Sequence, residues 1–187
     1  MKKLILLVVL SIAFVFSSSA QSQNISRFNI GFNGALALNN MNAIFDGGIG
    51  GSVKYEFHYK KIKPRLYFTA ESGYETFFVK QKLQMAYVPS TTSYIPIKGG
   101  LKYFIVSRLY AEFQAGTVLY TQHGGGSAFD YSPGIGFSFK SGFEIGVRYE
   151  EWYQTPEKHL KDDYGITGSF KDPGNFGQLA LRIAERF

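Results

Sequence analysis

Hydrophobic and polar residues alternate along most of the chain from residue 28 onward, with the period of two that places successive side chains on opposite faces of a β-strand. In the final segment, LALRIAERF, the residues Leu181, Ile183 and Phe187 share one face. Arg182 and Arg186 lie on the other face. Segments of this kind recur between clusters of turn-forming residues. We therefore predict eight strands, at residues 28–38, 48–59, 65–77, 93–104, 108–120, 129–140, 143–153 and 175–187.

The predicted connections between these strands alternate between short and long. The short ones are residues 60–64, 105–107 and 141–142, and the long ones are residues 39–47, 78–92, 121–128 and 154–174. Outer-membrane barrels combine tight periplasmic turns with longer extracellular loops in this way, and strands of about 10 to 13 residues tilted by about 40° match their apolar thickness. The pattern predicts a transmembrane barrel with both termini on the periplasmic side.

The composition of the two strand faces indicates which one points outward. One face is apolar and carries a single charge, Glu185. The other face combines acids, bases and many small residues, which a narrow eight-stranded interior requires if long side chains are to fit. Because a buried ion needs an opposite charge beside it, the near equality of the two signs favours an interior position. The charged residues of this face are Lys54, Lys98, Lys102, Arg148, Arg182 and Arg186, and Glu56, Glu71, Glu75, Glu112, Asp130, Glu144 and Glu150.

The N-terminal residues predict that the protein is secreted, and the composition excludes some other classes of protein. Lys2 and Lys3 precede the apolar run LILLVVLSIAFVF and the small residues SSSA, so residues 1–20 are predicted to be a cleaved signal peptide. That apolar run is shorter than the roughly 20 residues of a membrane-spanning helix. The chain has no Cys, which excludes a disulfide framework. Its basic residues form no block, so composition does not indicate nucleic-acid binding.

These features together resemble the small outer-membrane β-barrel proteins, with the architecture of the OmpA and OmpX membrane domains. The resemblance covers residues 28–187 and implies an eight-stranded antiparallel up-and-down transmembrane β-barrel, preceded by a short segment at residues 21–27. It also implies that the barrel-assembly machinery recognises the last strand. Phe187, Ile183 and Leu181 match the family's alternating apolar signal, whereas Glu185 departs from it.

Aromatic residues near the strand ends predict two interfacial belts, as in other membrane barrels. At the short-turn ends they are Tyr59, Tyr67, Tyr103, Phe104, Tyr110, Phe139, Phe143 and Phe187. At the long-loop ends they are Tyr74, Phe77, Phe78, Tyr94, Tyr120, Phe129, Tyr131, Trp152, Tyr153 and Phe176.

Few residues are candidates for catalysis or metal binding, and no pair of His residues has ligand spacing on one strand face. We interpret His58 as a hydrogen-bonded residue of the interior. His123, with Ser127 and a carboxylate such as Asp130, is the one candidate nucleophile and base arrangement, but the segment GGG beside it argues for a flexible loop tip.

The sequence also contains two pairs of closely spaced carboxylates. Asp162 and Asp163 are adjacent in a predicted loop, where solvation is favoured over cation binding. Glu71 and Glu75 are interpreted as ion-pair partners of the lysines on the neighbouring strand, Lys98 and Lys102, rather than as an acid and base. We therefore predict no catalytic, cofactor-binding or metal-binding residue.

The leading functional hypothesis is a non-enzymatic, monomeric outer-membrane barrel that acts structurally or in surface interaction, through loops 78–92 and 154–174. One alternative is a porin-like conduit, which the side-chain-filled interior of eight strands disfavours. Another is an outer-leaflet lipid-modifying enzyme that uses His123. A soluble periplasmic lipid carrier, with the same alternation turned inside out, is the rival at the level of the fold.

Overall fold

The computed structural model describes residues 26–58, 65–81, 90–121, 126–154 and 175–187. The predicted signal peptide, residues 1–20, lies outside these residues, as do His123 and most of the predicted loop 154–174. Among the described residues no helix is long and apolar enough to cross a membrane.

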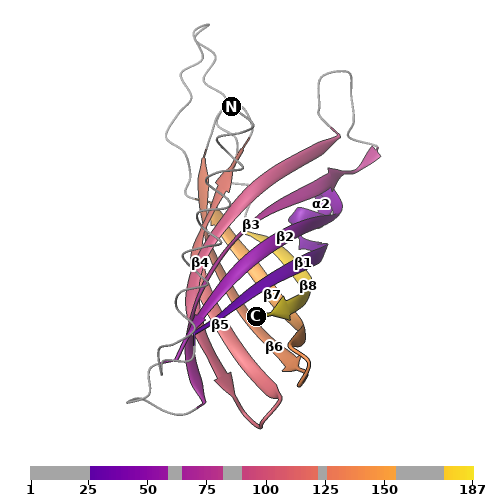
Figure 1. Ribbon diagram of the computed structural model, residues 1–187. Helices are drawn as coiled ribbons and strands as arrows, with labels where there is room; N and C mark the ends of the chain where they lie inside the picture. The colour runs from indigo at the N-terminus through magenta and orange to yellow at the C-terminus, as the bar shows by residue number, and fades with distance from the viewer. Residues whose placement is uncertain (1–25, 59–64, 82–89, 122–125, 155–174) are drawn as a thin grey trace, which may run out of the picture.

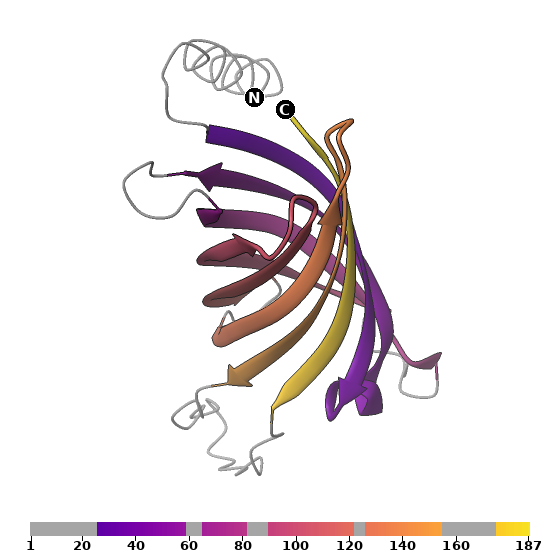
Figure 2. The ribbon, with the colours of Figure 1, turned by 90° about the horizontal axis from the view of Figure 1, so that it is seen from below.

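Eight strands form a closed barrel in which each strand pairs with its neighbours in the chain (Figures 1 and 2). Every pairing is antiparallel, including the pairing of the first strand with the last. The predicted up-and-down barrel is therefore confirmed. The strands are β1 (Ser26–Asn39), β2 (Phe45–Phe57), β3 (Leu66–Val79), β4 (Thr91–Phe104), β5 (Leu109–Tyr120), β6 (Ser127–Ser138), β7 (Phe143–Gln154) and β8 (Phe176–Arg186).

The last strand closes the barrel against the first. The β1–β8 register runs from the pair Asn29 and Arg186 to the pair Asn39 and Phe176. At its lower end Phe187 donates its backbone N–H to the carbonyl oxygen of Phe28 at 2.8 Å, and Phe28 donates back at 3.3 Å. The terminal aromatic residue therefore belongs to the seam that removes the sheet edges.

The first connection differs from the prediction. A short helix, α2 (Met41–Ile44), was not predicted, and β2 begins at Phe45, so residues 40–44 alone join β1 to β2. The predicted short connection between β2 and β3 is longer than this, because it spans residues 58–65. The strict alternation of short and long connections is thus wrong at this point. The buried side chain of Met41 explains the helix, since it packs into the end of the barrel.

The two predicted tight turns are present. Residues 105–108 join β4 to β5, and residues 139–142 join β6 to β7. Gly142 has φ 103°, a conformation that favours glycine, and donates its backbone N–H to the carbonyl oxygen of Phe139 at 3.2 Å. These turns lie at the lower end of the barrel, and α2 lies toward the other end (Figure 1).

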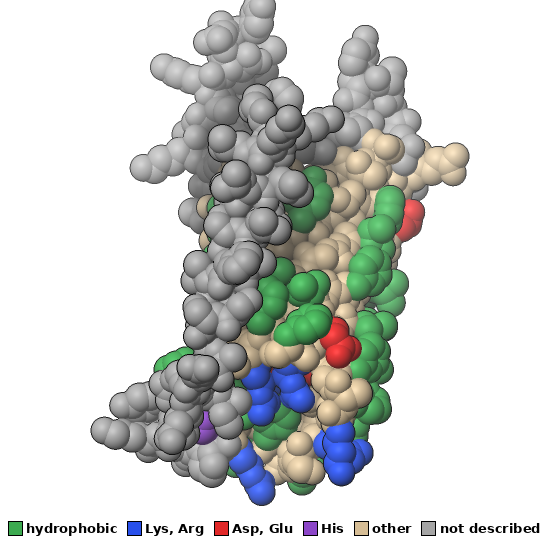
Figure 3. All heavy atoms as spheres, viewed as in Figure 1, with side chains coloured by type: hydrophobic (Ala, Val, Ile, Leu, Met, Phe, Trp, Pro, Cys, Tyr) green, Lys and Arg blue, Asp and Glu red, His purple; other side chains and the backbone are tan. Residues whose placement is uncertain are grey.

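The apolar face of the strands points outward, as predicted. Leu36 is 62% exposed, Ile135 61% and Phe113 52%, and Figure 3 shows hydrophobic side chains along the barrel wall. A water-soluble barrel would bury these residues, so the lipid-carrier alternative is wrong. The wall is suited to hydrocarbon, which makes the molecule a transmembrane barrel.

Candidate functional site

The interior of the barrel holds a network of charged residues, which we call the interior charge network. It contains the thirteen charged residues predicted for the polar strand face, and all but Arg186 and Glu112 are buried. The inward position of the polar face is therefore confirmed. The buried members are Lys54, Lys98, Lys102, Arg148 and Arg182, and Glu56, Glu71, Glu75, Asp130, Glu144 and Glu150.

Lys102 of β4 joins two opposite walls at the lower part of this network. Its Nζ atom lies 2.6 Å from Oε1 of Glu56 on β2 and 2.9 Å from Oε2 of Glu144 on β7. The same ammonium lies 4.1 Å from the ring centroid of Tyr110. A single buried cation therefore forms ion pairs with two carboxylates and also contacts an aromatic face.

In the middle of the network, buried cations again form ion pairs with carboxylates of other strands. Lys98 lies 2.7 Å from Glu150, and the guanidinium of Arg148 lies 2.7 Å from Glu71 and also contacts Glu150. Lys54 bridges two strands as well, at 3.2 Å from Glu71 and 2.7 Å from the half-buried Glu112. Charge pairing thus extends along the interior of the barrel, beyond the level of Lys102.

The predicted partners of Glu71 and Glu75 are wrong. The strand register does place Glu71 opposite Lys98, but both lysines on β4 reach past the adjacent strand to carboxylates on β2, β6 and β7. Glu75 instead accepts a hydrogen bond from Asn33 at 3.0 Å and lies 3.7 Å from Arg148. In a narrow barrel a long side chain reaches the opposite wall, so the ion pairs of Lys98 and Lys102 do not follow strand adjacency, whereas Lys54 does lie beside its register partner Glu71.

Neutral polar residues that we did not single out from the sequence complete the network. Gln114 donates to Glu71 at 3.0 Å, Gln178 donates to Glu150, and Arg182 donates to Ser52 at 3.0 Å. Their strand parity, which places them on the face of the acids and bases, is the signal that identifies them.

An aromatic cluster fills the barrel at the end that carries α2; we call it the loop-end cluster. The ring centroids of Phe77 and Trp152 lie 5.8 Å apart, and those of Tyr94 and Trp152 lie 5.0 Å apart. Trp152 is 1% exposed and Phe77 is fully buried. The other buried members are Ala35, Ala37, Met41, Phe45, Val79, Val118, Ala128, Phe176 and Ala180.

A second cluster, the turn-end cluster, consists of Tyr67, Phe104 and Tyr110 near the short turns. Phe104 packs edge-on against both tyrosines, with ring centroids 5.6 and 5.7 Å away. Gly136 makes room for Tyr110, because a Cβ there would run into the tyrosine side chain and would lie 2.7 Å from the carbonyl oxygen of Ile145. Small interior residues therefore have the role predicted for them.

These two clusters correct the prediction of aromatic belts. Tyr67, Phe104, Tyr110, Phe77, Tyr94, Trp152 and Phe176 point into the barrel, because their strand positions have interior parity. The outward half of each predicted belt is present. It includes Tyr103, Phe139 and Phe187 at one end, and Tyr74, Phe78, Phe129 and Tyr153 at the other.

The described members of the candidate catalytic set do not come together. Ser127 is exposed on the outer face of β6, whereas Asp130 is fully buried on the inner face, 3.5 Å from Lys98. The barrel wall separates the two side chains, so Asp130 is wrong as a partner of Ser127. His123, Asp162 and Asp163 lie outside the described residues.

Of the three histidines of the chain, His58 lies within the described residues. His58 is buried, as predicted for an interior residue, and its ring centroid lies 5.0 Å from that of Tyr67. Over the described ranges, no three His, Asp or Glu side chains are grouped so that they could hold a metal ion.

No family model and no curated protein matches this sequence, but solved structures match its fold. Ail, the attachment invasion locus protein of Yersinia pestis, in a phospholipid bilayer nanodisc, aligns with a TM-score of 0.55 at 12% identity, over 87% of this chain and 100% of its own. The outer membrane enzyme PagL aligns with a TM-score of 0.52 at 13% identity, over 84% and 98% of the two chains. The N-terminal β-barrel domain of Pseudomonas aeruginosa OprF aligns at 0.50 with 11% identity, over 88% and 100%.

This chain has the fold of the small outer-membrane β-barrel proteins. The resemblance to the OmpA and OmpX membrane domains is thereby confirmed at the level of the fold. Small outer-membrane barrels of this fold include an enzyme, PagL, so the fold alone assigns no activity.

Proposed function

We propose that this protein is a non-enzymatic, monomeric barrel of a bacterial outer membrane that acts structurally or in surface interaction through its loops. One observation carries the proposal: the interior is occupied by the charge network and by an aromatic cluster at each end. An eight-stranded barrel has an interior that side chains can fill, whereas open channels use about sixteen strands. The barrel therefore offers a membrane anchor rather than a passage.

Location and orientation follow from the wall and the connections. Outward apolar residues such as Ile30, Phe32 and Ile135 require hydrocarbon. The turns 105–108 and 139–142 are the tight kind that lie on the periplasmic side of outer-membrane barrels. We infer that both termini are periplasmic and that residues 80–90 and 155–175 connect strands on the extracellular side.

The last strand supports assembly by the barrel-assembly machinery. Leu181, Ile183 and Phe187 are exposed on the outer face, where a signal read during insertion has to be accessible. Glu185 shares that outer face. Its position at the end of β8 places the charge at the level of the lipid headgroups, outside the hydrocarbon.

A planar-bilayer experiment separates this proposal from the porin-like alternative. The purified barrel is expected to give no sustained conductance, because Trp152 and Phe77 close one end and Lys102 with its carboxylates crosses the interior. A suitable comparison is the variant with Trp152→Ala and Phe77→Ala, which opens one end but leaves the charge network in place. A stable ohmic conductance from the unmodified protein would refute the closed interior and favour a conduit.

An epitope-tag experiment tests the proposed orientation of the barrel in the membrane. A tag inserted after residue 165 is expected to be labelled by antibody on intact cells, and a tag inserted after Ser141 only after the outer membrane is permeabilised. The reverse pattern would contradict the orientation.

A His123→Ala variant tests the enzymatic alternative. The substitution is expected to leave the lipid composition of the outer membrane unchanged, and an altered acyl pattern would contradict the non-enzymatic proposal.

A further inference from the structure

The mouth of the barrel at the short-turn end forms a cavity of about 590 Å³ that is open to solvent, which we call the basic mouth. Five basic residues line it, from β1, β8 and three connections: Arg27, Arg65, Arg108, Lys140 and Arg186. No acidic residue is among the described residues that line it. Figure 3 shows Lys and Arg side chains gathered at this lower end of the molecule.

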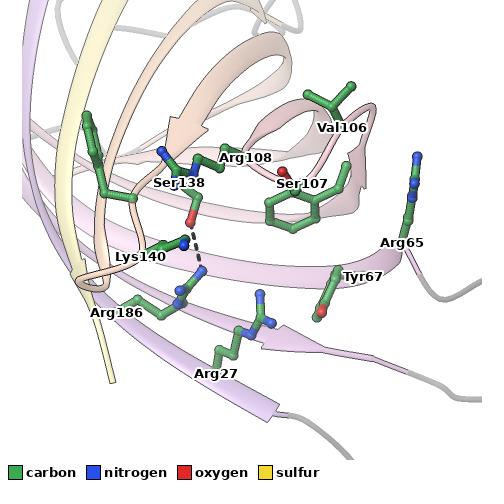
Figure 4. A pocket seen from close by; sticks show the side chains of 11 residues that line it. Arg27, Arg65, Tyr67, Val106, Ser107, Arg108, Ser138, Lys140 and Arg186 are labelled. Atoms are coloured by element: carbon green, nitrogen blue, oxygen red, sulfur yellow. Dashed lines mark hydrogen bonds between the residues drawn. The ribbon is translucent and has the colours of Figure 1, made fainter.

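Some of these side chains are held in place by neighbours that leave their charge unpaired. The guanidinium of Arg27 lies 4.6 Å from the ring centroid of Tyr67, and Arg65 donates to the carbonyl oxygen of Ile105 at 3.0 Å. Arg186 donates to Ser138 at 2.8 Å (Figure 4). It also lies 3.3 Å from Glu144. Arg186 is the member of the basic mouth that forms an ion pair within the described part of the chain.

The basic mouth therefore differs from the interior charge network directly above it. In the network, bases and acids neutralise one another over a few ångströms. In the mouth, Arg27, Arg65, Arg108 and Lys140 form no ion pair with any described carboxylate. Like charges around one cavity repel unless an anion occupies it, so the site gains stability from a negatively charged ligand.

The geometry of the donors identifies the chemistry of that ligand. Four of the five bases are arginines, whose planar guanidinium groups bind phosphate oxygens in a bidentate manner. A cavity of this volume lies in the range of small-molecule sites. Figure 4 shows Arg27 and Arg186 extending from their strands into the same space, with Arg108 and Lys140 entering from two turns. We propose that the basic mouth binds a small soluble anion that carries two or more phosphate groups.

A lipid phosphate is the other source of the same chemistry. Arg108 and Lys140 are exposed on turns at the rim, where headgroups of the adjacent leaflet could meet them. Arg27 and Arg186 have positions on the inner side of β1 and β8, and the cavity that all four line lies at the mouth. A soluble anion reaches this cavity from the aqueous side, whereas a lipid would have to leave the bilayer. The ligand that we propose is therefore soluble.

Calorimetric titration of tripolyphosphate tests the proposal. The full barrel is placed in nanodiscs of phosphatidylcholine, which has no net charge. We expect saturable binding that weakens as salt concentration rises, and that weakens by about tenfold in the variant with Arg27→Gln, Arg108→Gln and Lys140→Gln. The matched control is Lys80→Gln, which removes a base at the opposite end of the barrel and should leave the affinity unchanged. Different gel mobility of heated and unheated samples establishes that each variant is folded.

Three results would overturn the proposal. The first is the absence of binding heat from the unmodified protein, and the second is equal affinity of the unmodified and triple-variant proteins. The third comes from nanodiscs that contain phosphatidylglycerol: retention of that lipid by the unmodified protein but not by the triple variant, with no tripolyphosphate binding in either disc, would assign the basic mouth to lipid headgroups. None of these measurements depends on which side of the membrane the mouth faces.

Discussion

Lys102→Met provides a direct test of the interior charge network. The substitution keeps an unbranched side chain that is one atom shorter, and it removes the ammonium that lies 2.6 Å from Glu56 and 2.9 Å from Glu144. Glu144 keeps a second cation, since Arg186 lies 3.3 Å away. Glu56 is fully buried, and Lys102 is its ion-pair partner among the described residues. The variant therefore leaves one buried carboxylate without compensation.

The expected loss of unfolding free energy follows from the unpaired Glu56, since Glu144 keeps Arg186 as a partner. Removing one partner of a buried ion pair costs about 3–5 kcal/mol, because the remaining charge is desolvated and unpaired. Adding Glu56→Gln to Lys102→Met removes that charge and leaves Glu144 with Arg186. We expect the double variant to recover about 2 kcal/mol or more of the loss, as residues in one network couple at this scale.

Reversible unfolding in denaturant, with the barrel in micelles or vesicles, gives the free energy of unfolding of each variant. Trp152 is the only tryptophan of the chain, so its fluorescence reports the loop-end cluster, and gel mobility reports barrel closure. Lys80→Met is the control, because Lys80 lies outside the network and its Nζ atom donates to Asn42. Equal stability of Lys102→Met and the unmodified protein, or equal losses in the single and double variants, would refute the account of the network.

The remaining predictions concern the wall, the packing and the last strand. Phe32→Arg, in the middle of the outer face of β1, should cost about 2–4 kcal/mol of unfolding free energy in vesicles, and a neutral effect would mean that this face does not meet hydrocarbon. Gly48→Val places a Cβ about 2.8 Å from the ring of Phe77; it should cost about 1–3 kcal/mol, and less than that in a Phe77→Ala background. Phe187→Ala should slow insertion by purified barrel-assembly machinery but not spontaneous folding in micelles, whereas Phe139→Ala, another exposed aromatic at that end, should leave both rates unchanged.

The sequence predicts the strands and their two faces well, because both depend on local information. A period of two assigns every residue of a strand to one face, and a closed barrel turns those faces into inside and outside. Leu181 and Arg182 are adjacent in the chain, yet Leu181 is 44% exposed and Arg182 is buried, as their alternation indicates. The positions of the small residues follow from the same parity.

Residue type and position along the strand, without strand parity, do not predict which aromatic residues face the bilayer. Trp152 and Tyr153 are neighbours near the same strand end, and both belonged to the predicted belt. Trp152 faces the interior and is 1% exposed, whereas Tyr153 is 41% exposed on the wall. Applying the parity of β7 to these two residues would have separated a buried cluster from an interfacial one. The helix α2 offered a weaker signal, since four residues are too few to show helical periodicity.

The ion pairs that cross the barrel interior lie beyond what the sequence can predict, for a geometric reason. Neighbouring strands determine which residues share a height, and this register correctly places Glu71 beside Lys98. Which carboxylate a lysine contacts depends instead on the diameter of the closed barrel and on the strands that face one another across it. Lys98 of β4 contacts Glu150 of β7 at 2.7 Å, a pair that no hairpin brings together. Ion pairs that cross the interior thus form only in the closed barrel, and their contribution to stability arises at closure. Lys54 with Glu71 and Arg186 with Glu144 are different, because each of these pairs joins neighbouring strands.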